Sequence, residues 1–197
     1  MPALMALLLI VGSGGVGTAA IVPPPPVIAI TIPDSIRATL TEEYPGWQWA
    51  PSNKYVQQAF KKHHINRSPS FVQGDFDHNG KTDYAVQIAL TTPGQEEQII
   101  MVFLASDAGY EETIVQSMGL DPTIYLWVAA IPVDDPATAS DHAVKKDVLL
   151  VLGGPIGDTT YGYTNGGFHE IPLTEDARVP DFDIPRPPES PPERIDP

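Results

Sequence analysis

The order of hydrophobic and polar positions separates a short helical part of the chain from a longer part with strand-like alternation. Ile36, Leu40 and Tyr44 recur every four residues behind a helix-starting segment at 33–35, so they predict one apolar helix face. A second apolar stripe predicts a helix over residues 53–64. Both helices come before the strand-like part.

Strand patterns dominate the chain from Ser70 onward. Apolar and polar residues alternate, and Asn165-Gly166 can supply the positive φ angles of a tight hairpin turn. The segments with strand patterns are 82–90, 98–105, 110–116, 124–131, 147–152, 159–163 and 168–171, with an earlier one at 27–32. We therefore expect the α+β class: two short N-terminal helices packed on an antiparallel β-meander of six or seven strands.

The two ends of the chain differ in composition from the middle. Residues 1–20 join an apolar stretch to small residues, as in a secretory signal peptide, and four prolines make residues 21–26 a stiff spacer. Residues 177–197 are rich in proline and acidic residues and predict a disordered tail. The folded domain is expected over residues 27–176. Because no Lys or Arg precedes the apolar stretch, a retained membrane anchor stays open as an alternative to cleavage.

Charge and cysteine content narrow the classes of partner. The formal net charge is −14, which argues against nucleic acid because phosphate binding needs a basic surface. The chain has no cysteine, so disulfides and thiolate metal sites are excluded. Together with the N-terminal segment, this composition predicts a periplasmic or secreted protein, membrane-anchored if that segment is not cleaved and otherwise without a membrane span.

The segment Gly-Asp-Phe-Asp-His-Asn-Gly-Lys-Thr-Asp, residues 74–83, has oxygen side chains at alternating positions. Calcium takes six to eight oxygen ligands, and short loops supply them with this spacing. Gly80 permits the sharp reversal that such a loop needs. The candidate metal ligands are the side chains of Asp75, Asp77, Asn79 and Asp83 and the backbone carbonyl of Lys81.

The flanks of this loop distinguish it from an EF-hand. An EF-hand needs a bidentate glutamate twelve residues after its start, where this chain has Val86. Asp83 also runs directly into a strand pattern, whereas the EF-hand loop runs into a helix. A calcium loop at the entrance of a strand fits the residues better.

The run Gly-Asp-Phe-Asp-His-Asn-Gly-Lys-Thr-Asp-Tyr-Ala-Val resembles the calcium loops of FG-GAP and VCBS-type repeats in integrin-like β-propellers. The resemblance implies the same five ligands, a structural calcium ion and an exported protein. Asn79 replaces a carboxylate of that pattern, which lowers the charge of the site. The motif occurs once, whereas a propeller needs at least four blades. A metal-free acidic turn, capped by its own side chains, is the alternative.

Motifs for catalysis are missing from the sequence. It contains neither His-Glu-x-x-His nor Gly-x-Ser-x-Gly. Five aromatic residues could form a sugar-binding platform or fill the core: Trp47, Trp49, Trp127, Tyr161 and Tyr163.

These observations favour an exported, monomeric, calcium-binding module that recognises a protein or a carbohydrate and is not an enzyme. The alternative is an accessory domain or a hydrolase whose active site the sequence does not reveal. A concave pocket with converging polar groups would favour an enzyme. A flat aromatic face would favour binding.

Overall fold

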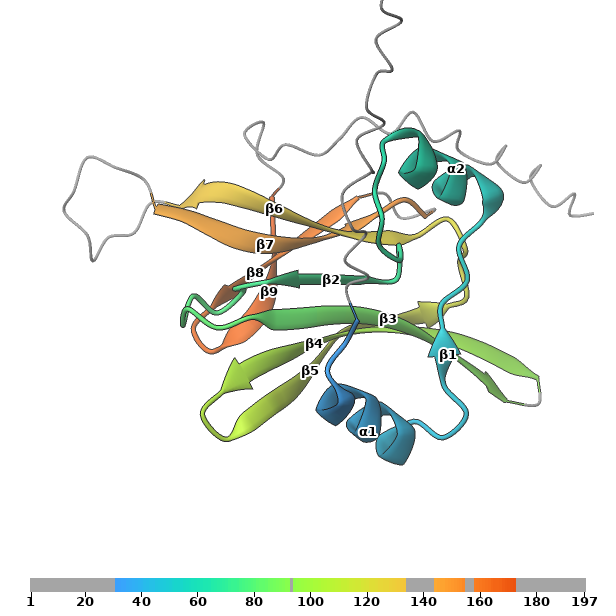
Figure 1. The fold of residues 1–197 in the computed structure, drawn as a ribbon, viewed down its shortest axis with the longest axis horizontal. Helices are drawn as coiled ribbons and strands as arrows, with labels where there is room; N and C mark the ends of the chain where they lie inside the picture. Colours follow the sequence, from blue (N-terminus) through green and yellow to red (C-terminus); the bar gives the residue numbers. More distant parts are fainter. Residues whose placement is uncertain (1–30, 93, 134–143, 155–157, 173–197) are drawn as a thin grey trace, which may run out of the picture.

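The computed structural model describes residues 31–92, 94–133, 144–154 and 158–172 (Figure 1). The predicted signal peptide, spacer and acidic tail lie outside these residues, as does most of the strand expected at 27–32. No helix in the described ranges is long and apolar enough to span a membrane.

Two antiparallel sheets and two helices make up the described structure. The helices are α1 (Asp34–Glu43) and α2 (Lys54–Lys62). Sheet A has the order β1-β3-β4-β5, with β2 also paired to β3, and sheet B has the order β6-β7-β8-β9. The strands are β1 (Gln48–Trp49), β2 (Phe71–Gly74), β3 (Asp83–Thr92), β4 (Gln95–Ser106), β5 (Gly109–Gly119), β6 (Tyr125–Val133), β7 (Val144–Leu152), β8 (Thr159–Thr164) and β9 (Gly167–Ile171).

The predicted α+β class is wrong, because the described part of the chain is mostly β, with 52% of its residues in strands and 15% helical. The predicted single meander is wrong as well. The ladder of sheet A ends at β5, and β6 begins a second sheet. The physical reason lies in β4, whose residues Ile99–Leu104 are buried on both faces of the strand. Two helices on one side of a sheet cannot cover both faces, so a second sheet covers the other.

Each helix packs on the outer face of a different sheet (Figure 1). Ile36 and Leu40 of α1 pack on sheet A against residues such as Met101. Val56 and Phe60 of α2 pack on sheet B. The helices therefore form the outer layers of a four-layer arrangement, and the expectation that both cover one sheet is corrected.

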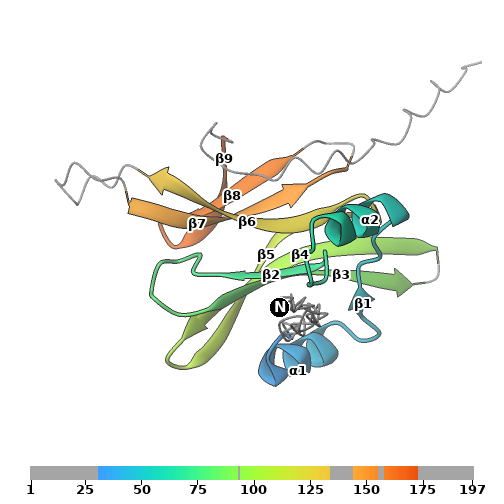
Figure 2. The ribbon, with the colours of Figure 1, turned by 45° about the horizontal axis from the view of Figure 1, so that its top comes forward.

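The central core lies between the two sheets. Ile100, Val102 and Leu104 of β4 meet Leu149 and Val151 of β7 there. On one side the sandwich is closed, because β2 and β6 lie beside each other (Figure 2). The backbone N–H of Leu126 donates to the carbonyl of Pro69 at 2.9 Å on that side. Asp75, which follows β2, and Asp147 of β7 are 72 residues apart in sequence and are hydrogen-bonded to each other in the fold.

Candidate metal centre

The acidic loop, residues 75–83, connects β2 to β3 in sheet A. The two strands pair in antiparallel register, with Gly74 opposite Asp83. The loop is therefore the turn of a hairpin, and its last residue is the first residue of β3. This placement brings the two ends of the loop within hydrogen-bonding reach of each other.

Three of the predicted ligands form a carboxylate cluster: Asp75, Asp77 and Asp83. One oxygen from each lies within 4.8 Å of the other two. Asp83 is fully buried, whereas Asp75 and Asp77 are partly buried. Among the described residues this is the one group of three or more acidic, histidine or cysteine side chains close enough to share an ion.

Asp83 fastens the acidic loop to the sheet. Its Oδ2 accepts hydrogen bonds from the backbone N–H groups of Phe76 at 2.7 Å and Asp77 at 3.4 Å. Its Oδ1 accepts from the N–H of Ala105, in β4, at 2.7 Å. Burial raises the pKa of this carboxyl group above its usual range, while the three backbone donors act in the opposite direction. The negative charge of Asp77 raises that pKa further.

The turn of the acidic loop is built from left-handed backbone and side-chain caps. His78 and Gly80 have φ angles of 62° and 82°. Oδ2 of Asp75 accepts from the N–H of Gly80 at 3.0 Å, and Oδ1 of Asp77 accepts from the N–H of Asn79 at 3.1 Å. These bonds curl the backbone around the carboxylate cluster.

The other oxygen of Asp75 has no partner among the described residues. Its Oδ1 is buried and accepts no hydrogen bond from them. A buried carboxylate oxygen without a donor or a cation is costly, since it has lost its water. The cluster therefore fits a hard cation: its donors are all oxygens, they converge, and one is left without a partner.

The two remaining residues predicted to bind the ion are Asn79 and Lys81, and their side chains bond other protein groups. Asn79 points its amide nitrogen at Oδ2 of Asp77, 2.9 Å away, and at the carbonyl of Ala105, 2.6 Å away. Its amide oxygen accepts from the N–H of Lys81 at 2.8 Å and so faces away from Asp77. The ammonium of Lys81 pairs with the exposed Asp107 at 2.5 Å, outside the cluster.

Two residues that support the acidic loop were not anticipated. Asp147, in β7, accepts from the N–H of Asp75 through its Oδ2 at 3.0 Å. Ala105 bonds the loop through both its N–H and its carbonyl. The sequence contained one indication of a role for Asp147, because it is a single carboxylate at the start of a strongly apolar strand pattern. Nothing in the sequence marks Ala105, because it acts through its backbone.

The five aromatic residues do not form one platform. Trp47 and Trp49 pack in the core beneath α1, Trp127 packs against α2, and Tyr161 and Tyr163 lie between the sheets. All five side chains are partly buried. They are divided among three separate clusters, which is the arrangement expected of core residues.

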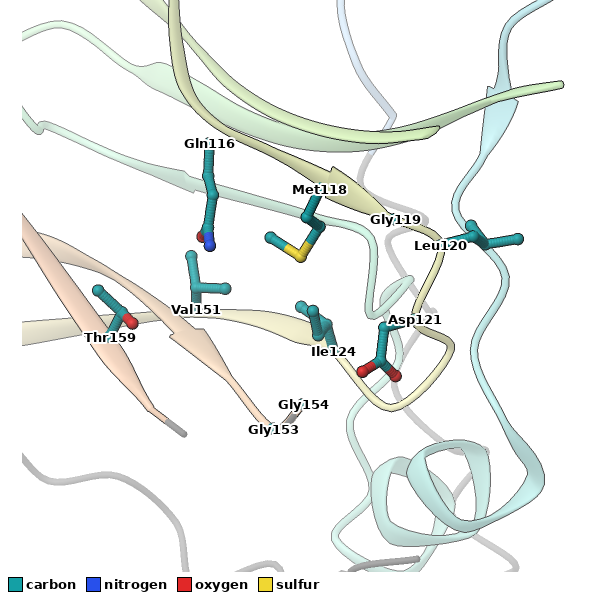
Figure 3. Close-up of a pocket in the computed structure, with 10 residues that line it drawn as sticks. All are labelled: Gln116, Met118, Gly119, Leu120, Asp121, Ile124, Val151, Gly153, Gly154 and Thr159. Atoms are coloured by element: carbon teal, nitrogen blue, oxygen red, sulfur yellow. The ribbon is translucent and has the colours of Figure 1, made fainter. Parts of the chain in front are cut away.

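A concave cleft of about 340 Å³ lies away from the acidic loop, between β5 and the ends of β7 and β8 (Figure 3). Among the described residues that line it, Asp121 is the one ionisable side chain. Most of its other lining residues are apolar or glycine.

No protein-family model, curated protein or solved structure matches the chain.

Proposed function

We propose that this chain is an exported, non-enzymatic binding domain whose acidic loop holds one structural calcium ion. The observation that carries the proposal is Oδ1 of Asp75, a buried carboxylate oxygen without a hydrogen-bond donor inside a cluster of three carboxylates. A cation at this point would give that oxygen its missing partner.

Electrostatics favour a divalent ion in the carboxylate cluster. Three carboxylates within 4.8 Å repel one another, and the buried position of Asp83 weakens the solvent screening of that repulsion. Calcium prefers oxygen ligands at about 2.3–2.6 Å and tolerates irregular geometry, whereas magnesium demands a near-ideal octahedron. A hairpin turn that brings three carboxylates together without an octahedral arrangement of ligands suits calcium better.

The proposed ligands are the side chains of Asp75, Asp77, Asn79 and Asp83 and the carbonyl of Lys81, with water completing the shell. For Asn79 to take part, its amide must rotate and exchange its bonds to Asp77 and Ala105. This exchange lowers the expected affinity. We place it in the range of about 10⁻⁴–10⁻³ M, typical of extracellular calcium modules.

The role of the ion is structural, because the acidic loop is connected to four strands. It joins β2 to β3, it bonds β4 through Ala105, and it bonds β7 through Asp147. An ion that neutralises the cluster would hold these contacts together. The cleft, lined largely by apolar residues, supports a binding role for the domain.

The test is calorimetric titration of chelator-treated protein with calcium, combined with thermal melts. At a free calcium concentration 100 times the Kd, the native fold should gain about 2.7 kcal/mol. Asp75→Asn should abolish this gain while keeping an oxygen for the N–H of Gly80. Asp107→Asn is the matched control, since Asp107 is exposed and pairs outside the cluster. An unchanged melting temperature of the wild type at 10 mM calcium would refute the calcium site.

Export is tested separately by fractionating cells that express the full chain. We expect the protein outside the cytoplasm. Recovery of the mature protein in the cytoplasm would refute export and leave the calcium site untouched.

A further inference from the structure

The cleft opens on the side of the sandwich opposite the β2–β6 contact. There the C-terminal half of β5 stands apart from the ends of β7 and β8 (Figure 3). Its volume of about 340 Å³ is at the lower end of the range for small-molecule sites. A space of this size suits a small organic molecule and is too small for a polypeptide segment.

The walls of the cleft are largely apolar. Met118 of β5 faces Ile124 and Val151 across it (Figure 3). Ile124 and Val151 are almost fully buried and belong to the core between the sheets. Met118 is flexible and can adjust to the shape of a bound apolar group. The walls can therefore accept a short hydrocarbon body.

One end of the cleft carries a fixed carboxylate. Oδ1 of Asp121 accepts from the N–H of Thr123 at 2.8 Å and from its hydroxyl at 2.6 Å. The same hydroxyl oxygen accepts from the N–H of Gly154 at 3.0 Å, which ties the end of β7 to this turn. These bonds hold the Asp121 carboxylate in place before any ligand arrives.

The second oxygen of Asp121 remains available. Oδ2 has no hydrogen bond to any residue in the described ranges, and Figure 3 shows the carboxylate pointing into the space beside Gly153 and Gly154. A Cβ atom at Gly154 would lie 3.5 Å from this oxygen, so glycine leaves the approach open. A ligand donor can therefore reach Oδ2 directly.

The negative charge at the cleft favours a positively charged ligand. No Lys or Arg is among its described lining residues, and a second carboxylate, that of Asp158, is bonded to the lining residue Gly153, whose N–H donates to Oδ1 of Asp158 at 3.0 Å. The whole chain carries a net charge of −14. An anion would be repelled, whereas an ammonium group would gain a charge-assisted hydrogen bond.

We propose that this cleft binds a small organic cation: a primary ammonium group on a short apolar body. The ammonium group pairs with Oδ2 of Asp121, and the apolar body lies against Met118, Ile124 and Val151. The amide of Gln116 projects into the far end of the cleft and can bond a polar tail (Figure 3). This inference names a ligand class for the binding domain proposed above, on which it rests, but it does not require calcium in the acidic loop.

The test compares three probes of equal length on the full chain: hexylammonium, hexanol and hexanoate. Binding is followed by NMR through the methyl group of Met118 and the side-chain amide of Gln116. Hexylammonium should bind with a Kd of about 1 mM, as expected for so few atoms, and at least tenfold more tightly than hexanol. Hexanoate should not bind.

Two variants separate the contributions of charge and apolar contact. Asp121→Asn should remove the preference for hexylammonium over hexanol, whereas Asp107→Asn, with the same change of charge elsewhere, should keep it. Met118→Ala should weaken hexylammonium and hexanol by the same factor. Equal binding of hexylammonium and hexanol by the wild type, or an unchanged preference in Asp121→Asn, would overturn the proposal.

Every titration is repeated with and without calcium. Preference for the cation in calcium-free protein would support the cleft even if the acidic loop bound no ion. Conversely, a calcium-dependent melting temperature without any probe shift would overturn the cleft and leave the calcium proposal standing.

Discussion

Arg67 contacts several separate parts of the fold. Its guanidinium donates to the carbonyls of Phe71 in β2 at 3.1 Å and Leu126 in β6 at 3.0 Å. It also lies over the rings of Trp127, 4.8 Å away, and Phe60, 5.2 Å away. Burial lowers the pKa of Arg67 to about 10. One planar cation thus connects α2 and both sheets at the closed side of the sandwich.

Replacing Arg67 by Met should destabilise the protein by about 2–4 kcal/mol, because carbonyl groups lose their donors and the aromatic rings lose the cation. Arg67→Lys should recover only part of the stability lost in the Met variant, because one ammonium group cannot reproduce the planar set of donors of a guanidinium group. The measurement is urea unfolding at pH 7. Arg37→Met, at an exposed position of α1, is the control and should change stability by less than about 0.5 kcal/mol. Equal effects of the two substitutions would contradict the assigned role.

At the scale of single residues, the sequence was sufficient to identify side chains that meet within one short segment of the chain. Asp75, Asp77 and Asp83 follow a local spacing, and the structure brings them together. The orientation of Asn79 could not be predicted, because it depends on the carbonyl of Ala105, 26 residues away. Asp147 was missed for the same reason, since its contact depends on how the sheets meet.

At the scale of elements, two turns use glycine in the left-handed region with different surroundings. Gly153, at the end of β7, has a φ angle of 84°, and a Cβ atom there would lie 2.4 Å from the carbonyl oxygen of Thr123. Gly80, in the acidic loop, has a φ angle of 82° and open space around it. Both positions need the left-handed backbone that favours glycine. At Gly153 a side chain would also collide with the carbonyl oxygen of Thr123.

Gly80→Ala should therefore cost about 1–2 kcal/mol of unfolding free energy, the usual penalty of left-handed backbone for L-residues. Gly153→Ala should cost more than about 3 kcal/mol, because the turn must also move away from Thr123. Urea or thermal unfolding of the two variants in parallel, without calcium, measures the difference. Equal costs would show that the contact between β7 and the turn at Thr123 is easily relaxed.

The elements with strong periodicity were predicted well. The helices expected near residues 34 and 53 begin at Asp34 and Lys54, and the strand expected at 98–105 lies within β4. The two-residue β1 and the four-residue β2 were missed. Such short strands exist through their pairing with β3, and no periodic pattern fits into so few residues.

At the scale of the whole molecule, the acidic loop connects the two sheets. Its residues belong to the β2–β3 hairpin of sheet A, and the N–H of Asp75 bonds Asp147 on the face of β7 that looks toward sheet A. Gly74 makes the approach possible, since a Cβ atom there would lie 3.2 Å from Oδ2 of Asp147. Loop geometry and sheet packing are thus coupled.

Asp147→Ala should lower stability without calcium by about 1–2 kcal/mol, the cost of leaving a backbone donor without its acceptor. It should also weaken calcium binding several-fold, because Asp75 loses a constraint on its position. Asp147→Asn keeps an oxygen acceptor and should stay close to wild type in both respects. Titration calorimetry and urea unfolding measure the two effects. Unchanged calcium affinity in Asp147→Ala would show that the loop is positioned by sheet A alone.

The arrangement of the whole molecule was the part least accessible from the sequence. Alternation identifies which side chains of a strand are buried but not which layer buries them. The continuous apolar run Ile99–Leu104 was compatible with helices on one face of a single sheet. The second sheet follows from pairings of β6 that no local pattern specifies.

From the topology we expect an order of folding events. Each sheet is assembled from consecutive segments, residues 48–119 for sheet A and 125–171 for sheet B, so most strand pairing is local. Local pairings form quickly, whereas docking of the two sheets must wait for both. The contact between Asp75 and Asp147 exists only after docking. If the proposed ion binds at the acidic loop, we therefore expect it to stabilise the native state more than the transition state, and so to slow unfolding while leaving the folding rate nearly unchanged.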